Sequence, residues 1–184
     1  GTWDLFRYPG IRSDSDMFTF GFRFRPWHDP RPLSPGKDIM HYLQETIRDY
    51  QLEPKIHYEH KLLSATWQAS QAWWELKIET AQGDITVRAR FLQLCCGYYN
   101  YEEAHRPSFL GEEDFKGQII HPQFWPKELD YSDKRVVVVG SGATAITLLP
   151  AMANSVKRVT MLQRSPTYIM SLPNRDVLYQ VLRY

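Results

Sequence analysis

Two glycines and an alanine stand at the spacing of a nucleotide-binding turn, directly after a run of four valines at 136–139. The turn consists of Gly140, Ser141, Gly142, Ala143, Thr144 and Ala145. In a G-x-G-x-x-G turn, the first glycine permits the sharp change of direction and the second lets the backbone approach a pyrophosphate. A small third residue lets the helix pack closely on the strand, and the helix N-terminus offers unpaired N–H groups to the phosphates. We interpret the segment as a dinucleotide site in preference to a glycine-rich turn without a ligand, because strand, turn, helix and second strand follow in the required order.

The end of the second strand indicates which dinucleotide binds there. Sites that prefer NAD usually carry Asp or Glu at this point, where the carboxylate accepts hydrogen bonds from the ribose hydroxyls. This chain has no carboxylate there, because the strand predicted at 157–163 leads through Gln163 into Arg164 and Ser165. A guanidinium and a hydroxyl suit a 2′-phosphate, so we expect Arg164 and Ser165 to select NADPH. The alternative is that Arg164 is an ordinary solvated surface residue.

The elements that must position the turn follow from hydrophobic periodicity and from the placement of glycine and proline. Strands are predicted at 135–140 and 157–163, with a helix at about 143–154 between them. A loop of mixed polarity is predicted before them, over about 97–133. This order of elements is typical of an α/β fold with a parallel sheet.

The beginning of the chain is predicted to hold a loop-rich segment and one helix. Proline is frequent in residues 1–35, which is unfavourable for the interior of a sheet because proline lacks the backbone donor. Ser34 as the N-cap and Pro35 at the first helical position predict the start of a helix. Apolar residues at helical spacing extend this helix over about 36–50.

Three extended runs are predicted next, at roughly 55–67, 72–80 and 85–95. Gly83 and Asp84 are predicted to form the turn between the second and the third run. The apolar residues of 91–95 are expected to be buried on both faces of a sheet. The composition changes near Gly97, which we predict as a domain boundary.

Composition and charge exclude several classes of function. The net charge of +1 provides no basic surplus for a nucleic-acid partner, and no apolar run is long enough to span a bilayer. No signal peptide is visible, and the two cysteines, Cys95 and Cys96, are adjacent and form no disulfide framework, so a cytoplasmic protein is expected. The histidines without metal-ligand spacing are His28, His41, His57 and His60. We therefore expect no metal, and the sequence leaves the oligomeric state open.

A longer motif lies shortly before the glycine turn. Residues 115–126 fit F-x-G-x-x-x-H-x-x-x-W-P at every fixed position. The fixed positions are Phe115, Gly117, His121, Trp125 and Pro126. This motif resembles the fingerprint of the Baeyer–Villiger flavin monooxygenases. Residues 1–16, 97–101 and 162–169 are similar to the subgroup that contains the ethionamide-activating and long-chain-alkane monooxygenases.

The resemblance implies an α/β flavoprotein monooxygenase with two Rossmann-like dinucleotide-binding domains, incomplete at both ends in this chain. Residues 1–97 would form part of the FAD-binding domain without its phosphate loop. Residues 98–184 would form a linker with the fingerprint and the first part of the NADPH-binding domain. In this family NADPH reduces FAD, and the reduced flavin reacts with O₂ so that one oxygen atom enters a small organic substrate, in Baeyer–Villiger enzymes a ketone. Alternatives are oxygenation of sulfur or nitrogen, hydroxylation of a long-chain alkane, or nucleotide binding without catalysis, and the fragment alone is expected to be inactive.

The resemblance also implies roles for individual residues. The segment that matches the stretch along the flavin is Thr2, Trp3, Asp4 and Leu5. Further matches to positions that contact FAD are Phe20 and Leu62. Asp14 matches a carboxylate near the flavin and the nicotinamide that holds an arginine, and it is the expected catalytic residue, with Arg12 and Ser13 beside it as cofactor-binding residues. Without the resemblance, residues 12–16 would be interpreted as a solvated turn.

For the fingerprint motif, the resemblance implies coupling between domains and no chemistry. His121 is expected to couple cofactor binding to domain motion, although a lone histidine is more often a structural residue. Trp125 is expected to pack in the core or at a hinge.

Overall fold

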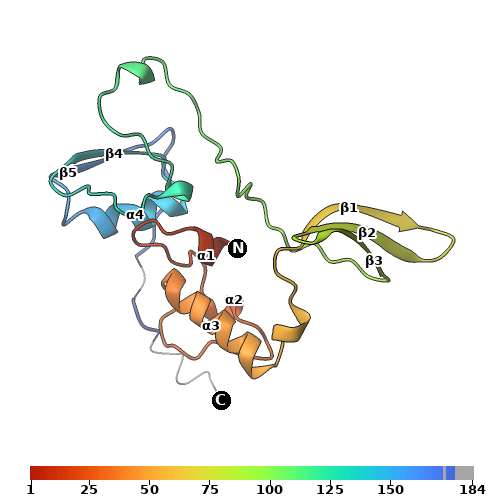
Figure 1. Ribbon diagram of the computed structural model, residues 1–184. Coiled ribbons are helices and arrows are strands. Elements are labelled where there is room, and N and C mark those ends of the chain that lie inside the picture. The colour runs from red at the N-terminus through yellow and green to blue at the C-terminus, as the bar shows by residue number, and fades with distance from the viewer. Residues whose placement is uncertain (172, 177–184) are drawn as a thin grey trace. The chain divides into compact units, whose positions relative to one another are not determined.

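The computed structural model describes residues 1–171 and 173–176, and Figure 1 shows their helices and strands. The chain divides into two compact units. The large unit combines residues 1–46 with the chain from 101 onward, and the small unit is residues 47–100. Each unit has its own sheet, of two strands in the large unit and three in the small one.

The large unit contains the expected strand–helix–strand motif. Its elements are β4 (Arg135–Val139), α4 (Ala143–Met152) and β5 (Arg158–Leu162). The two strands pair in parallel, with Val136 opposite Val159 and Val139 opposite Leu162. Figure 1 shows α4 beside these strands. The predicted elements and the α/β character of this part are therefore confirmed, with each element slightly shorter than expected.

The first residues of the chain form three helices. They are α1 (Thr2–Leu5), α2 (Met17–Phe20) and α3 (Gly36–Asp49). The helix predicted over 36–50 is thus confirmed. Its buried residues Ile39 and Tyr42 pack with Met17 and Trp27 in one hydrophobic core, so the apolar face of α3 orders the proline-rich loop that precedes it.

The predicted N-cap of α3 is wrong. The hydroxyl of Ser34 is buried and has no hydrogen-bond partner among residues 1–171 and 173–176. The backbone of Ser34 pairs with Ser13 instead, because Ser13 N donates to Ser34 O at 2.9 Å and Ser34 N donates to Ser13 Oγ at 3.0 Å. The first turn of α3 relies on Pro35 O, which accepts from Asp38 N and Ile39 N. Pairing with a distant segment turns the Ser34 hydroxyl away from the helix that it was expected to cap.

A second core joins the start of the chain to α4. Phe6 and Tyr8 are buried together with Leu148 and Met152 of that helix. The partly buried residues around them are Ile11, Tyr101, Trp125, Tyr131, Val136, Val138, Val156 and Val159. The segment expected along the flavin and the helix of the dinucleotide turn therefore belong to one packed body.

Gly10 allows the close approach of this segment to α4. Its φ is +78°, in the left-handed region that favours glycine. A Cβ at Gly10 would lie 2.4 Å from Thr147 O and 2.8 Å from Ala151 Cβ. A side chain at this position would therefore collide with the backbone of α4.

The small unit is an antiparallel meander. Its elements are the 3₁₀ helix η1 (Glu53–Lys55) and the strands β1 (Lys61–Gln68), β2 (Trp73–Thr80) and β3 (Gly83–Ala89). The strand order is β1-β2-β3, as Figure 1 shows. Trp67 lies opposite Trp74, and the buried Leu76 lies opposite Ala65 and Val87. Apolar cross-strand pairs of this kind hold a small sheet together.

Two details of the predicted strands are wrong. The first strand begins at Lys61, later than expected, because residues 53–55 form η1 and residues 58–59 form a turn. Gly83 and Asp84 belong to β3, and the turn is made by residues 81–82, because Gly83 pairs with Thr80. The Thr80 hydroxyl also donates to Gly83 O at 2.7 Å, which closes the tight hairpin two residues earlier than the glycine suggested.

The segment 91–95 is not the buried strand that was predicted. Phe91 is 92% exposed and Leu94 is 65% exposed. An apolar run becomes a buried strand only where neighbouring strands accept its hydrogen bonds, and among residues 1–171 and 173–176 no strand pairs with it. The predicted division into FAD and NADPH domains near Gly97 stays a prediction. The two compact units are defined by contacts within the chain and not by cofactor binding.

The predicted loop over 97–133 contains only short 3₁₀ helices. They are η2 (Glu112–Asp114) and η3 (Pro122–Phe124). In the described part of the chain, no helix has the length and apolar character needed to cross a bilayer. Cys95 and Cys96 are exposed free thiols, and the cytoplasmic setting stays a prediction.

Candidate functional site

The glycine turn leaves open space above its backbone. Gly140 has a φ of +121°, which favours glycine, and Gly140 N donates to Leu162 O at 2.9 Å. Gly142 has φ −77° and ψ −176°, which any residue adopts. A Cβ built at either glycine meets no atom within 4 Å. Neither the backbone conformation nor the packing of the protein therefore requires a glycine at position 142. The open space beside Gly142 fits a phosphate group.

The N-terminus of α4 offers hydrogen-bond donors without a competing anion. No side chain caps this end, and its first turn contains no acidic residue. The first intrahelical bond runs from Ile146 N to Gly142 O at 3.1 Å, which leaves the N–H groups of residues 143–145 directed out of the helix. Ala145 is buried, as expected for the small residue that lets the helix approach the strand. A dinucleotide pyrophosphate suits this arrangement.

Arg164 and Ser165 follow β5 at the same edge of the sheet. Both are exposed, and Arg164 makes no ion pair or hydrogen bond within the described residues. The hydroxyls of Ser141 and Thr167 form a hydrogen bond of 2.8 Å across this edge. A cation and several hydroxyls thus lie beside the glycine turn, where the carboxyl ends of parallel strands place a nucleotide.

The fingerprint motif packs against the core of the large unit. The Phe115 ring covers Gly117, where a Cβ would lie 2.5 Å from Phe115 Cζ. Trp125 packs on the core and meets the Tyr131 ring edge to face at 6.0 Å. Pro126, which follows, is exposed. The packing of Trp125 agrees with its expected structural role.

His121 is a capping residue in this structure. Its Nδ1 accepts a hydrogen bond from Gln123 N at 3.2 Å, at the start of η3. Partial burial, reinforced by the charges of Arg106 and His105, lowers the pKa of His121 below its ordinary value. The neutral ring is therefore the form that holds η3, because a protonated Nδ1 cannot accept the hydrogen bond.

We expect the cap at His121 to fail in mild acid. The folded pKa lies below the ordinary value of about 6.5, so the stability that the neutral ring contributes is complete above that pH and is lost as the pH falls through the folded pKa. NMR titration of the ring and amide exchange at Gln123 would measure this. His121→Asn is the control, because its side-chain oxygen can accept from the same N–H and does not titrate. Equal pH dependence of the Gln123 amide in both proteins would contradict the assignment.

The segment expected along the flavin is held by contacts within the large unit. The Thr2 hydroxyl lies 3.3 Å from the Tyr101 hydroxyl. Trp3 meets the Phe20 ring edge to face at 6.3 Å, so the structure brings these two expected residues together. Asp4 forms an exposed ion pair with Arg7, and Leu5 is 48% exposed.

The other expected flavin residues are divided between surface and core. Arg12 and Asp14 are exposed. Ser13 is buried, and its hydroxyl holds the loop by accepting from Ser34 N. Leu62 lies in β1 of the small unit and is 39% exposed. Their cofactor contacts stay predictions.

Sequence reasoning missed three residues that shape this site. Gly10 was interpreted only as part of a loop, although its packing on α4 fixes the start of the chain. Tyr101 and Thr167 lie in segments that carried the family resemblance and were given no role, although they bond to Thr2 and Ser141. The sequence shows that both residues carry a hydroxyl group, but it does not show which residues they bond to.

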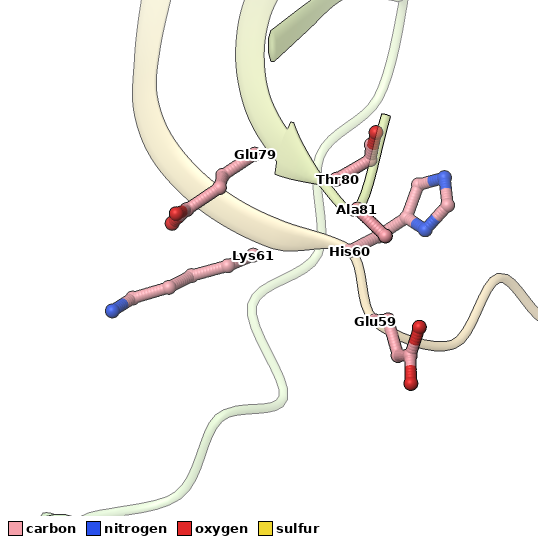
Figure 2. A pocket seen from close by; sticks show the side chains of 6 residues that line it. All are labelled: Glu59, His60, Lys61, Glu79, Thr80 and Ala81. Carbon is pink, nitrogen blue, oxygen red and sulfur yellow. The ribbon is translucent and has the colours of Figure 1, made fainter. Parts of the chain in front are cut away.

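The small unit has a depression of about 490 Å³ where β1 begins and β2 ends. It is lined by Glu59, His60, Lys61, Glu79, Thr80 and Ala81. Figure 2 shows the side chains of Lys61 and Glu79 pointing to one side and that of His60 to the other. These groups do not converge on one point, so the depression does not compete with the glycine turn as the candidate site.

Comparison with known proteins identifies the family of the chain. The model of the flavin-binding monooxygenase-like family matches residues 16–179. The FAD-containing monooxygenase EthA of Mycobacterium tuberculosis is 54% identical over 183 residues, and the match covers 99% of this chain and 37% of the relative. The probable FAD-binding monooxygenase AlmA of Acinetobacter baylyi is 54% identical over 185 residues, covering 100% and 37%. The chain thus spans little more than a third of the length of these curated relatives.

Solved structures of monooxygenases have a fold similar to that of this chain. A cyclohexanone monooxygenase mutant from Rhodococcus sp. Phi1 bound to NADP⁺ aligns with a TM-score of 0.78 and 26% identity, over 95% of this chain and 34% of that one. An oxidized steroid monooxygenase bound to NADP aligns with a TM-score of 0.74 and 29% identity, over 91% and 32%. Both alignments cover most of the chain and about a third of the solved protein.

Proposed function

Because this chain belongs to the flavin-binding monooxygenase-like family, we propose that the protein is an FAD- and NADPH-dependent monooxygenase. It inserts one oxygen atom of O₂ into a small organic substrate. The observation that carries the proposal is the glycine turn at 140–145, whose open backbone and uncapped helix fit a pyrophosphate. The exposed Arg164 beside it fits the 2′-phosphate of NADPH.

The residues of this chain bind and orient the cofactors. The N–H groups at the start of α4 donate to the pyrophosphate, and Arg164 and Ser165 donate to the 2′-phosphate. When bound, FAD supplies hydride acceptance and the activation of O₂. Thr2–Leu5 would contact the flavin, and Asp14 would help to hold an arginine that the resemblance places near the nicotinamide. The core that joins Phe6 and Tyr8 to α4 supports this proposal, because it holds both segments in one body.

We propose that His121 couples NADPH binding to domain motion. Its bond to Gln123 N caps η3, and η3 leads directly into Trp125 on the core. This placement supports a positioning role and gives no reason to assign it acid–base chemistry. The proposed FAD part at 1–97 and NADPH part at 98–184 would then be linked through the fingerprint.

The proposed reaction is Baeyer–Villiger oxidation of a ketone to an ester or lactone. The complete fingerprint with Trp125 and Pro126 supports it, as do solved neighbours named for cyclohexanone and steroid monooxygenases. The second candidate is oxygenation of sulfur, nitrogen or an alkane chain, which is favoured by the resemblance of residues 1–16, 97–101 and 162–169 to the ethionamide-activating and long-chain-alkane subgroup. Product analysis with a cyclic ketone and a sulfide would separate the two, because a lactone identifies the first reaction and a sulfoxide alone the second.

Arg164→Ala is expected to weaken the binding of NADPH far more than the binding of NADH. A lost hydrogen bond to a charged group is worth about 1.5–3 kcal/mol, or roughly 10- to 150-fold in affinity. The arginine is exposed and makes no hydrogen bond or ion pair with described residues, so the fold should not change. Dissociation constants of both cofactors for the full-length, FAD-loaded protein would measure the effect. An equal loss for NADPH and NADH would contradict the proposed cofactor preference.

A further inference from the structure

Residues 163–166 form a short loop whose two ends are both held by the glycine turn. At one end, Gly140 N donates to Leu162 O at 2.9 Å. At the other end, the hydroxyls of Ser141 and Thr167 form a hydrogen bond of 2.8 Å. Because Gly140 and Ser141 are consecutive residues, the loop is closed back onto one point of the turn.

This closed loop carries Arg164 and Ser165. We propose that Thr167 is a specificity-determining positioning residue, whose hydroxyl clamps the loop to Ser141 and so fixes the distance from Arg164 to the N–H groups of α4. That distance must match the span from the 2′-phosphate to the pyrophosphate of NADPH. The inference rests on the proposed use of NADPH and adds a residue that acts through Arg164.

Few other interactions hold this part of the chain. Within residues 1–171 and 173–176, the Ser141–Thr167 bond is the one hydrogen bond made by residues 163–171. Hydrophobic burial does not replace it, because Tyr168 is fully exposed and Met170 is 80% exposed. Without the clamp, the loop must be ordered when NADPH binds, and this ordering lowers the affinity.

Thr167→Val removes the hydroxyl and keeps the shape of the side chain. In the full-length, FAD-loaded protein, we expect the dissociation constant of NADP⁺ to rise roughly 2- to 12-fold, the usual range for one neutral hydrogen bond. NAD⁺ has no 2′-phosphate, so its dissociation constant should not change. Thr167→Ser keeps the hydroxyl and should retain the preference for NADP⁺. Isothermal titration calorimetry with NADP⁺ and NAD⁺ measures these constants without turnover.

Thr160→Val is the matched control. Thr160 is exposed on β5, and its hydroxyl makes no hydrogen bond with described residues. The same chemical change on the adjoining strand should therefore alter neither affinity. If the clamp acts through Ser141, Thr167→Val should also have no further effect on the affinity ratio in the Ser141→Ala background.

An equal loss of NADP⁺ and NAD⁺ affinity, an unchanged ratio, or a Thr167→Ser variant that behaves like Thr167→Val would each overturn the inference. The Arg164→Ala variant shows whether a negative result rules out only the role of Thr167 or the proposed NADPH site as well. If Arg164→Ala lowers NADP⁺ affinity selectively and Thr167→Val does not, only the clamp is wrong. If both variants leave the ratio unchanged, the assignment of NADPH to this edge is wrong.

Discussion

Gly142→Ala is expected to weaken NADP⁺ binding by roughly 10- to 150-fold and to leave the fold intact. The backbone at Gly142 suits any residue, and an added Cβ meets no protein atom within 4 Å. The new methyl group would therefore meet only the ligand. It would keep the pyrophosphate from the N–H groups of α4, so that at least one charge-assisted hydrogen bond is lost. Titration of the full-length, FAD-loaded protein with NADP⁺ measures the loss, and circular dichroism checks the fold.

Gly142→Ser separates the effect on the ligand from an effect on the helix. Serine is a preferred N-cap residue and alanine a poor one, so the serine variant should be at least as stable as the alanine variant. Both carry the same Cβ and should lose NADP⁺ affinity alike. Unchanged affinity in both variants would show that the pyrophosphate does not approach this turn.

Gly10→Ala should lower the free energy of unfolding by roughly 2–5 kcal/mol. A left-handed φ costs a residue other than glycine about 1–2 kcal/mol, and overpacking adds about 1–3 kcal/mol. Both apply here, because the φ is +78° and the Cβ would lie 2.4 Å from Thr147 O. The carbonyl belongs to the backbone of α4, which is fixed by the core beneath it. Urea unfolding of the purified protein measures the change.

Gly111→Ala is the control for the backbone conformation alone. Gly111 has a φ of +77°, but a Cβ there would meet no atom within 4 Å. Its substitution should cost only the conformational part, about 1–2 kcal/mol. If Gly10→Ala destabilises the protein no more than Gly111→Ala does, the close packing of Gly10 on α4 is wrong.

The dinucleotide turn could be predicted because its determinants are local. The valines at 136–139 favour a strand, and Gly140 and Gly142 follow at the spacing that the turn needs. Helix α3 was predictable for the same reason, since Ile39 and the apolar residues after it repeat at the helical period. The fingerprint around His121 was found by resemblance, because nothing in its residue types alone indicates a cap on a 3₁₀ helix.

Features that depend on distant segments could not be predicted. Serine is a common N-cap residue, but the backbone of Ser34 forms its hydrogen bonds with Ser13. The run 91–95 is apolar enough for a buried strand, but apolar character does not identify a pairing partner. Gly10 and Thr167 act through contacts with α4 and the glycine turn that no short window of sequence contains.

During synthesis, Phe6 and Tyr8 leave the ribosome long before Leu148 and Met152, the residues with which they are buried. Contacts between segments so far apart in the sequence form slowly, because the entropy of closing the intervening chain is lost before the contacts are made. These two aromatic side chains therefore stay exposed until the segment that forms α4 has been synthesised, and until then they can associate with other nascent chains. The segment around Phe6 and Tyr8 is thus prone to association with other chains until α4 is available to cover it.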